Sequence, residues 1–464
     1  MARFRICILA GFGLLLAPAL SAAEAPVEAL GNWTARSPLD RARNLLRTGQ
    51  TAAAENLIQS ALIDSADDAL LCLLGEIHFR RADFTQATAD FQAALDRDPA
   101  NARAWWGLGR IEQIHFRSSQ ARAYFSKAFQ LDHRDPDILL SFAAVITDPA
   151  AKATLFDNLV RLHRYTASER AAAAAAELAI FERLQGRQPA RLASPYTAYN
   201  IPLTGYRPAT ATQDGLLLEV RVNGAKPLKL LLDTGARGIV LNARAARNLT
   251  LETVTASQLQ GIGDAAATQA RVAVARNVST GGLTLEDCLI EVSGRDLAPG
   301  ADGVIGADVF AAFKIGIDAP ARTLHLTPFD EQVSPAPALT VPALGIRNLL
   351  LVRARIAGGK EGFFLMDTGA AYSVISPAYL PPSHHIDCAL EMQGAQGPVS
   401  ARRIGPVVLE SSGATFFDSA PIAMDLAAVS QAEGVEIAGI LGYSALAKSP
   451  FTLDLRNGAI EFPR

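Results

Sequence analysis

The same four residues, Asp-Thr-Gly-Ala, occur twice in this chain, at positions 233–236 and 367–370, each time directly after an apolar run. A single Asp-Thr-Gly is also ordinary turn chemistry, because Asp and Gly are favoured in loops that follow strands. Two copies in matching surroundings instead indicate an internal duplication. We therefore expect two similar lobes, each of which presents one carboxylate from a tight loop.

The surroundings of the two copies match in their order along the chain. A β-hairpin is expected before each acid, with turns at Asn223-Gly224 and Gly358-Gly359, and a β-branched stretch follows each acid. Thirty residues after each acid comes a glycine-bearing turn. Roughly 70 residues after each acid, an apolar segment bounded by glycines closes the unit. The turns contain Gly261 and Gly263 in the first copy and Gly394 and Gly397 in the second; the closing segments are 303–306 and 439–442.

This pattern resembles the aspartic peptidases, and more closely their retropepsin-like lobe than the longer pepsin lobe. The resemblance covers roughly residues 200–464 and rests on the repeated motif, the glycine-bearing turns and the closing segments. It implies two all-β lobes that face each other across a cleft, with a mobile flap over the substrate. By position, it assigns a catalytic dyad to Asp233 and Asp367, dyad support to Thr234, Gly235, Thr368 and Gly369, and the flaps to Gly261, Gly263, Gly394 and Gly397.

The chemistry of such a dyad also follows from elementary electrostatics. Two carboxylates in contact in a desolvated site cannot both ionise, so the pair shares one proton. The ionised member can then take a proton from water while the protonated member protonates a peptide carbonyl oxygen. A polypeptide substrate is expected, with no cofactor. No metal is expected either, because residues 384–388 contain metal-binding residue types but match no ligand spacing.

Two questions remain open from the sequence. The first is whether the protease cleft has lost activity and serves, together with the helical repeats, as a non-catalytic polypeptide-binding scaffold.

The second is the position of Arg237, which follows the first motif where the second motif is followed by Ala371. Its guanidinium either lies close to the dyad, where it would favour ionised carboxylates, or points into solvent.

Residues 34–187 are rich in alanine and contain two consecutive 34-residue blocks. Large, small and aromatic residues recur in each block in the order typical of tetratricopeptide repeats, which the region resembles. The matching residues are Leu71, Leu74, Gly75, Ala87, Phe91, Ala94 and Pro99 in the first block, and Trp105, Leu108, Gly109, Ala121, Phe125 and Ala128 in the second. Such repeats commonly bind a partner protein, and a spacer role is the alternative.

Residues 1–23 combine two arginines, a short apolar run and small residues, which is typical of a secretory signal peptide. An uncleaved membrane anchor is the alternative, although the run is short for a span of about 20 residues. Removing 1–23 takes away two arginines and no acids, so the formal charge moves from −3 to −5. This acidic balance gives no indication of nucleic-acid binding. The three remaining cysteines are too few for a disulfide framework, and buried positions are expected for them.

Together these observations predict a multidomain α + β protein. A signal peptide (1–23) precedes an all-α tetratricopeptide solenoid (34–187), a linker predicted from its prolines (188–208) and two retropepsin-like lobes (209–330 and 338–464). The expected function is that of an exported aspartic endopeptidase, periplasmic or secreted, without a stable membrane span once the signal peptide is cleaved. The expected partners are a polypeptide substrate and, at the repeats, a partner protein.

Overall fold

The computed structural model describes residues 7–8, 37–65, 67–162, 169–207, 215–259, 261, 268–331, 339–394 and 397–463. The expected signal peptide lies outside these residues except for Cys7–Ile8, which forms the two-residue strand β1 beside β17. The described residues divide into two compact units. A mainly helical unit runs to Leu178 and includes Ala427–Glu436; a mainly β unit holds Ala179–Leu426 and Ile437–Arg464.

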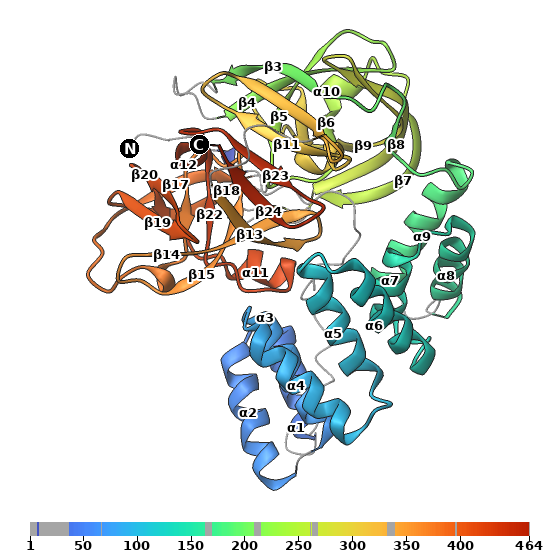
Figure 1. Ribbon diagram of the computed structural model, residues 1–464, viewed down its shortest axis with the longest axis vertical. Helices are drawn as coiled ribbons and strands as arrows, with labels where there is room; N and C mark the ends of the chain where they lie inside the picture. Colours follow the sequence, from blue (N-terminus) through green and yellow to red (C-terminus); the bar gives the residue numbers. More distant parts are fainter. Residues whose placement is uncertain are drawn as a thin grey trace. The chain divides into compact units, whose positions relative to one another are not determined.

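The helical unit is built from consecutive helical hairpins (Figure 1). Its helices are α1 (Pro38–Arg47), α2 (Thr51–Asp64), α3 (Asp68–Arg80), α4 (Phe84–Arg97), α5 (Ala102–Ile114), α6 (Ser118–Leu131), α7 (Pro136–Val145), α8 (Pro149–Leu162) and the start of α9 (Glu169–Arg183). Helix α11 (Ala427–Glu433) is assigned to this unit as well. The predicted class, helical repeats followed by β lobes, is confirmed.

Capping and close packing explain why these helices begin and pair where they do. The side chains of Asp67, Asp83 and Asn101 accept hydrogen bonds from backbone N–H groups in the first turns of α3, α4 and α5. The Phe91 ring, 1% exposed, lies against Gly75 on α3 and Gly107 on α5. A Cβ at either glycine would clash with that ring, so the small residues of the repeat pattern are required by helix packing.

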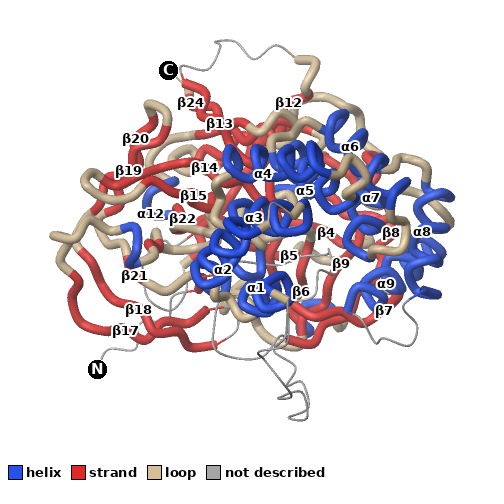
Figure 2. The backbone as a smooth tube through the Cα atoms, turned by 90° about the horizontal axis from the view of Figure 1, so that it is seen from below, coloured by secondary structure: helices blue, strands red, loops and turns tan. Residues whose placement is uncertain are grey.

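The β unit contains two lobes of similar construction (Figure 1; Figure 2, strands in red). Lobe 1 contains β2 (Arg191–Leu192), β3 (Tyr199–Tyr206), β4 (Gly215–Val222), β5 (Leu228–Asp233), β6 (Ile239–Asn242), α10 (Ala243–Ala246), β7 (Glu252–Leu259), β8 (Thr268–Thr280), β9 (Leu283–Ser293), β10 (Gly303–Gly306), η3 (Ala307–Phe310), β11 (Phe313–Asp318) and β12 (Thr323–Pro328).

Lobe 2 has a similar order of elements, although none of its strands is as long as β8 or β9 of lobe 1. It contains β13 (Leu339–Ile346), β14 (Leu349–Ile356), β15 (Glu361–Met366), β16 (Val374–Ile375), η4 (Pro377–Tyr379), β17 (Ile386–Gly394), β18 (Gly397–Ile404), β19 (Val407–Ser411), β20 (Ala414–Asp418), β21 (Ile422–Ala423), β22 (Gly439–Leu441), α12 (Tyr443–Leu446), β23 (Phe451–Asp454) and β24 (Ala459–Phe462).

The two lobes are joined by one antiparallel sheet with strands from both, which we call the shared sheet. Its strand order is β3–β12–β11–β23–β24–β13. The lobes meet where Ile315, Gly316 and Ile317 of β11 pair with Leu453, Thr452 and Phe451 of β23. Backbone hydrogen bonds therefore run continuously from one lobe into the other.

Residues 188–208 are not the linker that the sequence predicted. They contribute β2, which pairs with β9, and β3, which pairs with β12 in the shared sheet and with β4 in lobe 1. Pro202 misled the prediction, but it occupies the part of β3 that pairs with β12 alone, a position where a strand tolerates proline. Lobe 1 thus begins well before residue 209.

The predicted end of the helical region at residue 187 also differs from the division into units, which falls after Leu178. The reason is apolar packing: Ile180 and Leu184 at the end of α9 bury against Val272 and Val274 of β8. The end of this helix therefore belongs to the core of lobe 1.

Within the described residues, no helix is both long enough and apolar enough to cross a bilayer.

Cys72 and Cys288 are buried free thiols, and burial raises the pKa of each to about 12. Inert, buried thiols of this kind match the structural role expected for them. The side chain of Cys388 lies outside the described part of the chain.

Candidate active site

Each Asp-Thr-Gly-Ala loop is fixed by a strand that is inserted beside it. β10 lies between β5, which it pairs in parallel, and β6, which it pairs antiparallel. β22 occupies the same place between β15 and β16 in lobe 2. Gly306 pairs with Asp233, and Leu441 pairs with Met366 directly before Asp367. The sheet register therefore sets the position of both acids.

The structure brings the two carboxyl groups together in a closed site. Asp233 and Asp367 are both 0% exposed. Each glycine of the motif packs against the acid of the other lobe: a Cβ on Gly235 would lie 2.6 Å from Asp367 Oδ2, and one on Gly369 would lie 2.7 Å from Asp233 Oδ1. Only glycine permits this approach, so both motif glycines are explained by contact with the opposite carboxyl group.

The two oxygens of each carboxyl group have different environments. Asp233 Oδ1 accepts a hydrogen bond from Gly235 N–H (2.8 Å), and Asp367 Oδ1 accepts from Gly369 N–H (2.8 Å) and Ala370 N–H (2.9 Å). Within the described residues, the Oδ2 atoms are buried and have no partner apart from the opposite carboxyl group. These two atoms are thus the ones that can share a proton and hold a water molecule.

The Thr hydroxyls connect the lobes reciprocally. Thr234 Oγ1 donates to Met366 C=O (2.8 Å) and accepts from Thr368 N–H (3.0 Å). Thr368 Oγ1 donates to Leu232 C=O (2.9 Å) and accepts from Thr234 N–H (3.1 Å). Both threonines are buried, so these four hydrogen bonds are shielded from water.

Burial raises the pKa of both acids. The pKa of Asp233 rises well above its usual value of 3.8, first through burial and then through the neighbouring Asp367 carboxyl group. Burial raises the pKa of Asp367 to about 6, while Asp233 and the N–H groups of Ala370 and Gly369 oppose that rise. The pair titrates as a unit, and the larger rise in pKa at Asp233 favours the shared proton there.

Arg237 does not point into solvent, since it is only 4% exposed. Its charge lowers the pKa of Asp308 against the larger, raising effect of burial on that acid. The pKa of Asp233 is instead raised by burial and then by Asp367, and the pKa of Asp367 is raised by burial. The sequence hypothesis of a guanidinium that favours ionised dyad carboxylates is therefore not supported.

Two acids that the sequence analysis did not single out hold the loops behind the dyad. Asp308 Oδ1 accepts from Gly238 N–H (2.8 Å) in lobe 1. In lobe 2, Asp418 Oδ2 accepts from Ser373 N–H (2.9 Å) and from the Ser444 hydroxyl. The two lobes thus stabilise equivalent loops with acids from different elements, which conceals the equivalence in the sequence.

Of the glycines expected in the flaps, Gly394 and Gly397 lie at the tip of a hairpin. Gly394 pairs with Gly397 where β17 turns into β18. Gly261 follows β7, and Gly263 lies outside the described residues. The threonines, acids and glycines of the two motifs thus converge on one site. For the described flap residues, the strand pairing gives their position in a hairpin and not their distance from the dyad.

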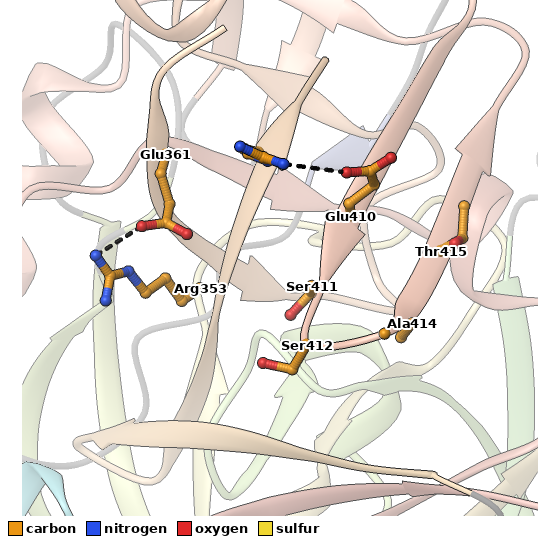
Figure 3. A pocket seen from close by; sticks show the side chains of 9 residues that line it. Arg353, Glu361, Glu410, Ser411, Ser412, Ala414 and Thr415 are labelled. Atoms are coloured by element: carbon orange, nitrogen blue, oxygen red, sulfur yellow. Dashed lines mark ion pairs between the residues drawn. The ribbon is translucent and has the colours of Figure 1, made fainter. Parts of the chain in front are cut away.

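A surface pocket of about 520 Å³ in lobe 2 is a different kind of site (Figure 3). Its charged side chains already pair with each other: Arg353 with Glu361 (2.6 Å) and Arg355 with Glu410 (3.7 Å). Neither dyad acid lines it.

In the described residues no cluster of His, Cys, Asp and Glu could hold a metal ion, residues 384–388 included where they are described.

Comparison with known proteins identifies the class of this site. Residues 218–309 match the family model described as Aspartyl protease, so the chain carries an aspartyl protease family domain. The matched stretch runs from β4 into η3 and includes Asp233. The similarity to aspartic peptidases inferred from the sequence is confirmed at this level.

A solved structure of a Thermobaculum terrenum O-GlcNAc transferase mutant is similar at 20% identity, over 27% of this chain and 25% of that chain, with a TM-score of 0.24. The match thus spans about a quarter of that protein. No curated protein matches the chain.

We expect Thr234→Val to destabilise the protein by roughly 2–4 kcal/mol, because it leaves Thr368 N–H and Met366 C=O buried without partners. Thr234→Ser keeps the hydroxyl and should restore most of the loss. Urea unfolding of the full chain measures both, with the exposed Thr415→Val as the control. A Thr234→Val protein as stable as the control would show that the hydrogen bonds between the lobes contribute little.

Proposed function

We propose that this protein is an aspartic endopeptidase in which the Asp233–Asp367 pair activates water for peptide hydrolysis. One observation carries the proposal: two buried carboxyl groups from separate loops meet, and each keeps one oxygen without a further partner among the described residues. The aspartyl protease family match over residues 218–309 supports the same chemistry for lobe 1. It implies a peptide substrate.

In the proposed mechanism the proton favoured on Asp233 and the charge on Asp367 define the roles. Asp367 accepts a proton from a water held between the Oδ2 atoms, and that water attacks the peptide carbonyl carbon. Asp233 gives its proton to the carbonyl oxygen, which yields a tetrahedral diol. The backbone N–H groups on Asp367 Oδ1 stabilise the carboxylate until it takes the proton from water.

Asp233→Asn and Asp367→Asn each remove the shared proton while keeping the side chain's size. We expect either change to lower kcat/KM for peptide hydrolysis on the order of 10³-fold or more, with peptide binding retained. Cleavage of a mixed peptide library and peptide affinity measure the two effects. A wild-type protein that binds peptides but cleaves none between roughly pH 3 and 8 would favour the non-catalytic scaffold.

Mixing the Asp233→Asn and Asp367→Asn proteins tests whether the dyad forms within one chain or between two chains. Both acids of the site come from one chain, so the mixture should stay inactive. Recovered activity would mean that lobes from different chains pair to rebuild one intact site.

The pH profile should follow the raised pKa values of the pair. Activity needs one proton on the dyad, and the second acid, Asp367, protonates as the pH falls through about 6. The proton on Asp233 persists well above pH 3.8 because its pKa is raised. We therefore expect kcat/KM to rise through about pH 6 and to fall only at higher pH; maximal activity near pH 3 would contradict this order.

We further propose that the protein is exported, on the strength of the residue pattern of positions 1–23. Deleting these residues should leave the protein in the cytoplasm, and fractionation of producing cells measures this. Equal export with and without them would overturn the proposal.

The helical repeats are proposed to add affinity for polypeptides, which predicts a lower KM for a protein than for a short peptide taken from it. A spacer role predicts equal KM for the two substrates.

A further inference from the structure

Glu291 is a buried acid in lobe 1 that the proposed mechanism does not use. It lies in the middle of the sheet on β9, where it pairs with Val240 of β6 on one side and Val272 of β8 on the other. It is only 5% exposed. A carboxyl group is rarely placed so deep without a specific interaction, because burial without a partner costs free energy.

The strand pairing places Glu291 between two apolar clusters: its partner Val272 packs with Ile180 and Leu184, whereas its partner Val240 belongs to the cluster that contains Ala236 of the dyad loop. Paired residues on neighbouring strands share a face of the sheet, so Glu291 is on the face of Val240. Val240 belongs to a cluster, here called the lobe-1 cluster, that links the dyad loop to the end of the flap strand β7. Its members are Tyr206, Leu217, Leu231, Ala236, Val240, Leu259, Leu297, Ala298, Ala301 and Val304.

Two members show why a substrate side chain would reach this cluster. Ala236 is the last residue of the first motif, three positions after Asp233, and Leu259 is the last residue of β7. The lobe-1 cluster therefore extends from the dyad loop to the end of the flap strand, the two elements between which a substrate of the proposed peptidase would lie. Ala270 of β8 also packs against it, so the cluster reaches the three strands that surround Glu291.

Among the described residues, only burial and the Ser257 hydroxyl act on the Glu291 carboxyl group, and no opposite charge does. Glu291 Oε2 is buried without a hydrogen-bond partner among the described residues. Burial raises the pKa of Glu291 to about 7, and the nearby Ser257 hydroxyl on β7 opposes that rise. Two cationic side chains on the elements around it have other partners: Arg183 of α9 pairs with Glu252 of β7, and Arg271 of β8 donates to Thr253.

The duplication supplies an internal comparison. Val374 of β16 stands seven residues after Asp367, as Val240 stands seven after Asp233. Val374 pairs in parallel with Ile422 of β21, as Val240 pairs in parallel with Glu291. Ile422 is 2% exposed. The fold therefore accepts an apolar residue at this place, and the acid in lobe 1 is not a requirement of the architecture.

We propose that Glu291 determines specificity in the substrate subsite of lobe 1 and that it binds a substrate side chain ending in a cation, lysine or arginine. This inference rests on the proposed peptidase function and names its substrate class. A cation in the subsite supplies the missing counter-charge and the hydrogen-bond donors for Oε2. The equivalent subsite of lobe 2, with Ile422, takes an apolar side chain, so the two sides of the cleft differ in preference.

A peptide library cleaved by the wild type, Glu291→Gln and Glu291→Ile tests this. At one substrate position we expect the wild type to prefer Lys over norleucine, a side chain of similar length without the charge. Glu291→Gln should reduce the Lys-to-norleucine ratio of kcat/KM at least tenfold, and Glu291→Ile should reverse it. Cleavage of the norleucine peptide should stay within about twofold in Glu291→Gln.

Glu286→Gln is the matched control, because Glu286 lies on the same strand but is exposed and paired with Arg191. It should leave the ratio unchanged. An unchanged ratio in Glu291→Gln, or an equal loss in the control, overturns the proposal. A change in melting temperature of Glu291→Gln without a change in the ratio assigns Glu291 a structural role only.

A binding measurement separates this inference from the proposed function. The Lys and norleucine peptides are titrated against Asp233→Asn protein, with and without Glu291→Gln. If the wild type cleaves nothing, the peptidase proposal fails, while at least tenfold tighter binding of the Lys peptide that depends on Glu291 still supports a cationic subsite. Equal affinity for the two peptides, or no binding of either, overturns it.

Discussion

Four hydrogen bonds between Thr234, Thr368 and the backbone of the opposite lobe are the contacts on which the rest of the site depends. Each threonine hydroxyl both donates and accepts, so neither loop can move without leaving buried groups of both lobes unsatisfied. The glycines then bring each backbone against the opposite carboxyl group. The raised pKa values of Asp233 and Asp367 follow from this closure, because it removes water from both acids and brings Asp367 against Asp233, which raises the pKa of Asp233 further.

Duplication has kept this centre symmetric while the periphery diverged. The loops behind the acids are held by Asp308 in one lobe and by Asp418 with Ser444 in the other. The strands beside the cleft carry Glu291 in one lobe and Ile422 in the other. A symmetric dyad suits a reaction in which one proton is shared, whereas a peptide has a direction and its two sides differ. A symmetric dyad with different residues beside it, Glu291 in lobe 1 and Ile422 in lobe 2, fits these two requirements.

The sequence predicted the parts of the site that the duplication repeats. The acids, threonines and glycines of the two motifs could be aligned with each other, and their convergence followed from a fold that pairs equivalent loops. Asp308 and Asp418 could not be found in this way, because they come from elements that are not equivalent. Glu291 gave a weaker signal: a lone acid between Ile290 and Val292, in a strand where alternation alone would have predicted exposure. Prolines in residues 188–208 suggested a linker, but Pro202 fits a half-paired position in β3.

The shared sheet has a consequence for how the protein can be divided. Its central pairing joins β11 of lobe 1 to β23 of lobe 2, so each lobe completes the hydrogen bonding of the other. Either lobe produced by itself would present a bare strand edge of unpaired N–H and C=O groups, a template on which further copies assemble. Proteolytic nicking between the lobes should therefore be tolerated far better than their separation, since the cut halves would stay together through the backbone bonds of that sheet.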